Sequence, residues 1–160
     1  WSEGAEINLV IVGKEGWKGL PEMARRDIPT TIERLRSHSE LNRRLYFLEG
    51  ISDEYLEKVY GASTCLIAAS YGEGFGLPLV EAAQHDLPIL ARDIPVFREV
   101  AGENAYFFQA EEDSSGLTSA VQTWLQLYEG QSHPKSDAMH WLTWKESSEK
   151  MLSGILPVDA

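Results

Sequence analysis

Short apolar runs alternate with segments of helical spacing along the whole chain. The runs lack strict alternation with polar residues, which is typical of strands buried on both faces. Strand followed by helix, repeated in this order, predicts βαβ units and an α/β fold with a doubly wound parallel sheet. We expect strands at residues 8–12, 45–48, 64–69, 87–91 and 105–108, and helices at residues 30–39, 52–60, 77–86, 94–100 and 117–128.

The length of the chain, 160 residues, suits one domain. The sequence therefore predicts a single domain over residues 1–160, closed by a helical segment at residues 141–156. Because the chain opens with Trp1 and not with Met, we expect it to be part of a longer protein.

Charge and composition exclude several classes of function. Fourteen Lys and Arg stand against 25 Asp and Glu, and the net charge of −11 repels nucleic acid. The one cysteine, Cys65, sits among apolar neighbours, which favours a buried small side chain over a nucleophile. The four histidines are scattered, so no metal site is expected, and a reducing compartment fits best. No apolar run approaches the roughly 20 residues of a membrane span.

The segment after the third predicted strand carries the chemistry. Three glycines, Gly72, Gly74 and Gly76, precede a predicted helix that has Pro78 near its start. Glycines permit close approach to the backbone, and unpaired N–H groups together with the helix dipole favour an anion at the helix N-terminus. The pattern predicts an anion site at the carboxyl edge of the sheet.

Two glutamates, Glu73 and Glu81, flank this predicted anion site and would repel a phosphate. The conflict disappears if their carboxylates accept hydrogen bonds from hydroxyl groups while backbone amides bind the charge. A nucleoside-diphosphate sugar combines both kinds of group. The alternative is a glycine-rich turn with an exposed acid, in which Glu81 is only a solvated helix residue.

These residues resemble a known family. Seven residues separate Glu73 from Glu81, and the segment is similar to the E-x7-E signature of the GT4 family of retaining glycosyltransferases, which have the GT-B fold. The chain resembles in particular bacterial mannosyltransferases that build lipopolysaccharide O-antigen or related polysaccharides. Further similarity lies in residues 10–13, 51–56, 94–100 and 144–148. The resemblance implies a Rossmann-like donor-binding domain, the C-terminal half of a GT-B enzyme, truncated at its N-terminal edge.

The family resemblance also implies roles for individual residues. Glu73 would contact the transferred sugar near the reacting carbon and is the candidate catalytic residue, and Glu81 would bind the ribose hydroxyls. The amides of the loop would bind the sugar and the diphosphate and stabilise the charge of the leaving group. The backbone at Gly13 would pass close to the phosphates, and residues 48–52 would border the base. The implied donor-binding residues are Gly13, Leu48, Ile51, Gly74, Phe75, Gly76, Leu77 and Glu81.

The activity that the resemblance implies is that of a hexosyltransferase which needs no metal and no cofactor, with GDP-mannose as the favoured donor. The acceptor, a glycan or lipid-linked glycan such as growing O-antigen, would bind through an N-terminal acceptor domain that is absent from these residues. The isolated 160 residues are expected to be inactive. The full-length protein would be cytoplasmic, peripheral at the inner face of the cytoplasmic membrane.

Two other interpretations remain. The chain could be a non-catalytic, glycosyltransferase-like binding module in a larger protein, although the intact glutamate pair argues against decay. Another Rossmann-like enzyme, such as an epimerase or dehydrogenase, is disfavoured because no G-x-G-x-x-G follows the strand that ends near Gly13. Lys14 and Lys18 could add positive charge or be solubilising residues, Arg92 could be a phosphate contact or an ion-pair partner, and Asp93 is expected to cap a helix.

Overall fold

The computed structural model describes residues 1–2, 4–13, 28–109 and 115–155. Contacts between residues divide the chain into two compact units, residues 1–59 and residues 60–160, and each is described by itself. The single domain over residues 1–160 stays a prediction. Lys14 and Lys18 lie outside the described residues.

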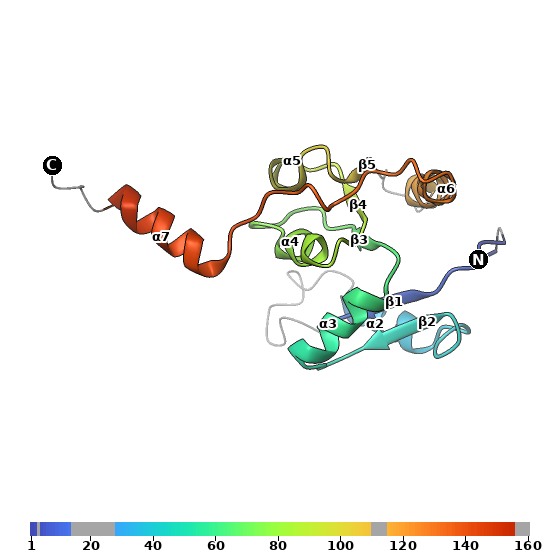
Figure 1. The fold of residues 1–160 in the computed structure, drawn as a ribbon. Coiled ribbons are helices and arrows are strands. Elements are labelled where there is room, and N and C mark those ends of the chain that lie inside the picture. Colours follow the sequence, from blue (N-terminus) through green and yellow to red (C-terminus); the bar gives the residue numbers. More distant parts are fainter. Residues whose placement is uncertain (3, 14–27, 110–114, 156–160) are drawn as a thin grey trace, which may run out of the picture. The chain divides into compact units, whose positions relative to one another are not determined.

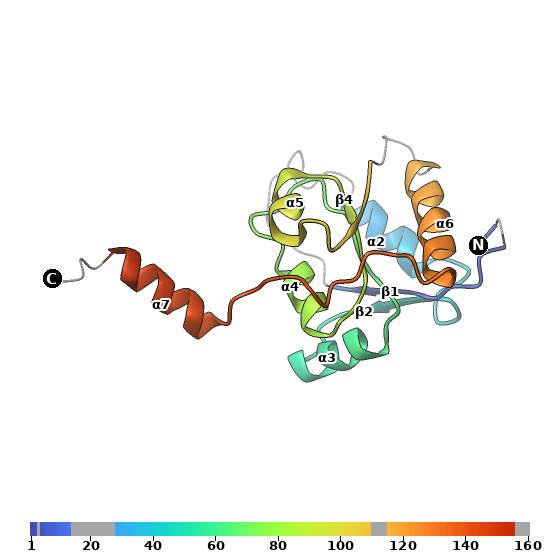
Figure 2. The ribbon, with the colours of Figure 1, turned by 45° about the horizontal axis from the view of Figure 1, so that its top comes forward.

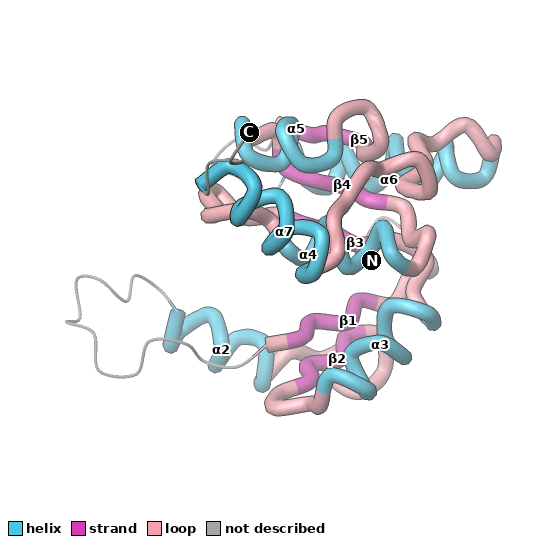
Figure 3. The backbone as a smooth tube through the Cα atoms, turned by 60° about the vertical axis from the view of Figure 1, so that its left-hand side comes forward, coloured by secondary structure: helices cyan, strands magenta, loops and turns pink. Residues whose placement is uncertain are grey.

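The first unit is built around two parallel strands. The pairing places Leu9 opposite Leu45 and Val12 opposite Leu48. A helix separates the two strands in sequence, so this part of the chain is a βαβ unit (Figure 3). Its elements are β1 (Leu9–Val12), α2 (Ile28–Arg36), β2 (Leu45–Leu48) and the larger part of α3 (Asp53–Ala62), whose last turn belongs to the second unit.

The second unit contains a three-stranded parallel sheet in the order β3-β4-β5 (Figure 1). Helices connect its consecutive strands, so two more βαβ units follow one another along the chain. The elements are β3 (Leu66–Ala68), α4 (Leu77–Gln84), β4 (Ile89–Arg92), α5 (Pro95–Ala101), β5 (Tyr106–Phe108), α6 (Ser115–Glu129) and α7 (Trp144–Ile155).

The core of the second unit surrounds the central strand. Every residue of β4 is buried, because both faces of this strand are covered. Leu90 packs with Phe108 of β5 and with Ala120 and Trp124 of α6. Helix α4 packs against β3 and against α5 (Figure 2). This packing holds the carboxyl ends of β3 and β4 and the start of α4 in one compact body.

The parallel α/β class expected from the sequence is confirmed, and the strands in the described part of the chain are distributed over two sheets of two and three strands. The helical segment expected at residues 141–156 begins later, at Trp144. The reason is a capping box: the Thr143 N–H donates to Glu146 Oε2 at 2.8 Å, and the Glu146 N–H donates to Thr143 Oγ1 at 3.2 Å. The described part of α7 ends at Ile155.

Candidate functional site

The glycine loop, residues 72–76, connects the end of β3 to the start of α4 in the second unit. Gly76 is the N-cap of α4 and has a φ of 87°, in the left-handed region. A Cβ atom at this position would lie 3.0 Å from Cε1 of Phe97 on α5. The backbone conformation therefore favours glycine at position 76, and a Cβ atom there would crowd the Phe97 ring.

The N-terminus of α4 has no side-chain cap. Among the described residues, no acceptor binds the N–H groups of Gly74, Phe75, Gly76 and Leu77. The Leu79 N–H donates to the Gly76 carbonyl at 2.9 Å, and Pro78 has no N–H to offer. The side chains of Phe75 and Leu77 are exposed. These four N–H groups lie next to the positive end of the helix dipole, where an anion is favoured, and the anion site itself stays a prediction.

Glu73 lies on the loop with an exposed side chain. The Ser70 hydroxyl donates to Glu73 Oε1 at 2.7 Å, which ties the carboxylate to the chain just beyond β3. A carboxylate in this place can accept hydrogen bonds from the hydroxyl groups of a ligand at the loop.

Arg92, the last residue of β4, packs against the segment that follows β3, and its roles as a phosphate contact or an ion-pair partner stay predictions. Its Nε donates to the carbonyl of Ala69 at 3.0 Å, and its guanidinium carbon lies 3.8 Å from the centre of the Tyr71 ring. The Phe108 ring is 5.5 Å away, and only 8% of Arg92 is exposed. Hydrogen bonding and cation–π attraction therefore hold the segment that leads from β3 to Glu73. The buried place of Arg92 beside two aromatic rings is decided by long-range packing, and its sequence position carries no signal for it.

Asp93, expected to cap α5, does not do so, because the N-cap is Ile94 and it makes no side-chain cap bond. The carboxylate of Asp93 instead accepts two hydrogen bonds from Arg98, at 2.7 and 2.8 Å. These charged bonds hold the pKa of Asp93 below its ordinary value.

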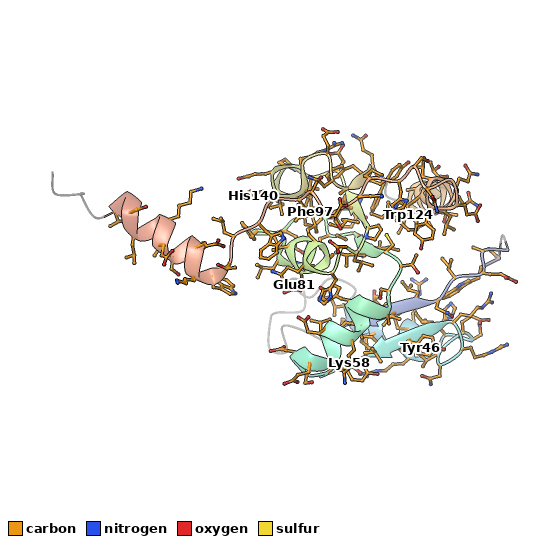
Figure 4. The ribbon with its side chains drawn as sticks, viewed as in Figure 1. Tyr46, Lys58, Glu81, Phe97, Trp124 and His140 are labelled. Carbon is orange, nitrogen blue, oxygen red and sulfur yellow. The ribbon has the colours of Figure 1, made fainter. Side chains whose placement is uncertain are left out.

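Glu81 lies in the second turn of α4 and is half-buried (Figure 4). The hydroxyl group of Tyr60 donates to Glu81 Oε2 at 2.8 Å. The ring of Tyr60 stacks on His85, with ring centres 5.4 Å apart and planes inclined by 18°. His85 therefore has a packing role. Sequence reasoning missed Tyr60, because 21 residues separate it from Glu81.

The first unit has a hollow of about 240 Å³ at the carboxyl ends of its two strands. Two of the predicted donor-binding residues, Gly13 and Ile51, line the hollow. Leu48 does not line it, but its carbonyl accepts a hydrogen bond from the Gly13 N–H at 3.1 Å. The other lining residues are Val12, Gly50, Ser52, Asp53 and Leu56.

The structure thus brings the predicted residues together in two groups. In the first unit, Gly13, Leu48 and Ile51 gather at the ends of β1 and β2. In the second unit, Glu73, residues 74–77 and Glu81 follow one another along the glycine loop and α4.

In the described ranges, no group of three or more His, Cys, Asp or Glu residues could hold a metal ion. No described helix has the length and apolar composition needed to cross a bilayer. The Cys65 thiol packs beside the Leu90 cluster, and burial raises its pKa to about 12, as expected of a packing residue.

The site combines a glycine loop, an uncapped helix start and two flanking glutamates. Comparison with known proteins shows to which class of protein this combination belongs. A family model described as "Glycosyl transferases group 1" matches residues 2–141. The chain belongs to this family.

The chain is similar in sequence to two proteins that are named as mannosyltransferases. The chain is 49% identical over all 160 residues to the serotype-specific mannosyltransferase WbdA of Escherichia coli. It is 30% identical over 127 residues, 79% of its length, to the O-antigen chain mannosyltransferase RfbU of Salmonella typhimurium. The chain covers 18% of WbdA and 32% of RfbU, so it spans only a part of each relative.

Solved structures confirm the fold class. The structure of Anabaena Alr3699/HepE in complex with UDP and glucose matches 79% of the chain with a TM-score of 0.58 and 19% identity. Sucrose-phosphate synthase from Thermosynechococcus elongatus matches 79% with a TM-score of 0.59 and 23% identity. The chain covers 33% and 31% of these two structures.

Proposed function

We propose that this chain is the donor-binding part of a retaining mannosyltransferase that transfers mannose from GDP-mannose to a growing polysaccharide such as O-antigen. The observation that carries the proposal is the uncapped N-terminus of α4 with a carboxylate on each side of it, Glu73 before the helix and Glu81 within it. Its family membership and its relatives, which are named as mannosyltransferases, support the choice of sugar.

The glycine loop would bind the diphosphate and the sugar through its backbone. The N–H groups of residues 74–77 point to no acceptor among the described residues, and a Cβ atom at Gly72 or Gly74 would meet nothing within 4 Å. The space beside these glycines is therefore not needed for the packing of the protein. Such N–H groups stabilise the negative charge that grows on the leaving diphosphate as the glycosidic bond breaks.

The two carboxylates would bind the hydroxyl-bearing parts of the donor. Glu73, tied by Ser70, would contact the transferred sugar, and Glu81, bonded to Tyr60, would bind the ribose. Gly13, Leu48 and Ile51 would border the phosphates and the base. Because backbone amides supply the counter-charge, the proposed transfer needs neither a metal ion nor a cofactor.

The remaining parts of the proposal concern the full-length protein. A glycan or lipid-linked glycan acceptor would bind to an acceptor domain outside this chain. The reaction would take place in the cytoplasm, at the inner face of the cytoplasmic membrane.

The proposal is tested by kinetics of the full-length protein with GDP-, UDP- and dTDP-sugars in the presence of EDTA. We compare wild type with Glu73→Gln, Glu81→Gln and the control Glu99→Gln, which changes an exposed glutamate on α5. Glu73→Gln is expected to lower kcat by about 10²–10³, the usual effect of losing one electrostatic contact in the transition state. Glu81→Gln should mainly raise KM, and Glu99→Gln should resemble wild type.

The other outcomes discriminate between functions. A full-length protein that turns over no sugar nucleotide in any version would support the non-catalytic binding module. Turnover that EDTA abolishes would contradict the metal-free mechanism. Equal activity of wild type and Glu73→Gln would remove Glu73 from the catalytic role.

A further inference from the structure

The carboxylate of Glu81 already has a partner within the protein. Tyr60, in the last turn of α3, is only 9% exposed, and its hydroxyl group donates to Glu81 Oε2 at 2.8 Å. A buried phenol is usually hydrogen-bonded, and Glu81 accepts from it here without any ligand. Among the described residues, no donor is bound to the other oxygen, Oε1.

The ring of Tyr60 is held in place as well. His85 lies four residues after Glu81, at the C-cap of α4, and its ring stacks on Tyr60 with centres 5.4 Å apart. Residues four apart lie on the same face of a helix. One face of α4 therefore supplies both the carboxylate that accepts from Tyr60 and the ring that orients Tyr60.

Such an arrangement restricts the carboxylate before any ligand arrives. A glutamate on a helix surface samples several rotamers, and ordering it on binding costs free energy. The bond from Tyr60 fixes one oxygen of Glu81, so the other keeps one direction. A single fixed acceptor discriminates between a ligand that offers a hydroxyl group there and one that lacks it.

We propose that Tyr60, stacked on His85, is a positioning residue that fixes Glu81 so that Oε1 receives a ribose hydroxyl group, and that Tyr60 thereby sets the preference for ribose over deoxyribose in the donor. This inference rests on the proposed function, in which Glu81 binds the ribose. The inference assigns a role in donor binding to Tyr60 of α3, which lies outside the glycine loop and α4.

The experiment uses the full-length protein with GDP-mannose and with its 2′-deoxy and 3′-deoxy analogues. Tyr60→Phe keeps the ring on His85 and removes only the hydroxyl group. Tyr55→Phe is the matched control, because Tyr55 lies on the same helix and is 50% exposed. Thermal melting of each variant verifies that it is folded.

For Tyr60→Phe we expect KM for GDP-mannose to rise about tenfold, with little change in kcat. The preference for GDP-mannose over the deoxy analogue that lacks the bound hydroxyl group should fall by a similar factor. Tenfold corresponds to about 1.4 kcal/mol, the order of one hydrogen bond to a charged group. Tyr55→Phe should keep the wild-type KM and preference.

A purely structural role for Tyr60 would raise KM for the ribose and deoxy donors equally, and this result would overturn the inference. Unchanged KM and preference in Tyr60→Phe would overturn it too. Glu81→Gln separates the two proposals. If it leaves the ribose preference intact, the proposed role of Glu81 fails and the inference fails with it. If it abolishes the preference while Tyr60→Phe does not reduce it, only the inference fails.

Discussion

Helices α4 and α7 begin in opposite ways. The first turn of α7 is closed by its own sequence, since Thr143 and Glu146 exchange hydrogen bonds at its start. The first turn of α4 follows Gly76, which offers no side-chain acceptor. Orphan N–H groups at a helix start are stabilised by side chains, water or a ligand. The difference teaches that α4 leaves its N-terminus open to another molecule and that α7 does not.

The two helices also differ in what stabilises them. Helix α4 buries Leu79, Ala82 and Ala83, and none of the residues of α7 is buried. Short helices in water depend on tertiary packing for most of their stability. The buried face of α4 therefore stabilises this helix although its N-terminus is uncapped. The stability of α7 depends more on its capping box.

The largest effect is expected at the start of α4. Gly76→Ala places an alanine in the left-handed backbone region and brings its Cβ atom to 3.0 Å from the Phe97 ring. Such a conformation costs about 1–3 kcal/mol for a residue other than glycine, so local opening of residues 72–84 should become easier by this amount. Hydrogen exchange in the full-length protein measures it. Gly74→Ala, which meets no neighbour, is the control and should leave exchange unchanged. Equal protection in both variants would refute this account of Gly76.

A smaller effect is expected at the start of α7. Thr143→Ala removes the side-chain oxygen of the capping box and should weaken α7 by about 1 kcal/mol, the usual cost of losing such a cap. Hydrogen exchange over residues 144–155 should rise, and KM for the donor should stay at the wild-type value. Thr143→Ser retains the oxygen and should behave as wild type. A change in KM with Thr143→Ala would show that the two helix starts are not independent.

The smallest effect concerns pH. The backbone N–H and the side chain of Thr143 hold the pKa of Glu146 below its ordinary value of 4.5. The folded pKa is lower than the unfolded one, so the contribution of this cap is complete above about pH 4.5 and is lost as pH falls through the lowered pKa. Carbon NMR of the Glu146 carboxyl group should therefore show a midpoint below 4.5. Thr143→Ala should move that midpoint upward, and an unchanged midpoint would argue against the Thr143 hydroxyl as a cause.

Much of the fold follows from local patterns. Helix α4 begins at Leu77 as predicted, because glycine and proline mark the start of a helix in any context. The T-x-x-E pattern at Thr143 would have placed the start of α7 correctly, because a capping box is also a local signal. The local pattern failed at Asp93, which was expected to cap a helix. Its carboxylate instead accepts two charged hydrogen bonds from the Arg98 guanidinium.

For this protein, the sequence by itself determined the order of strands and helices, the glycine loop and the spacing of Glu73 and Glu81, because these depend on residues close together in the chain. Only the tertiary structure decided that Arg92 holds the segment before Glu73, that Phe97 closes the space at Gly76 and that Tyr60 holds Glu81. Each of these contacts joins different elements of the fold. Their geometry depends on strand register and helix packing, which no local pattern contains.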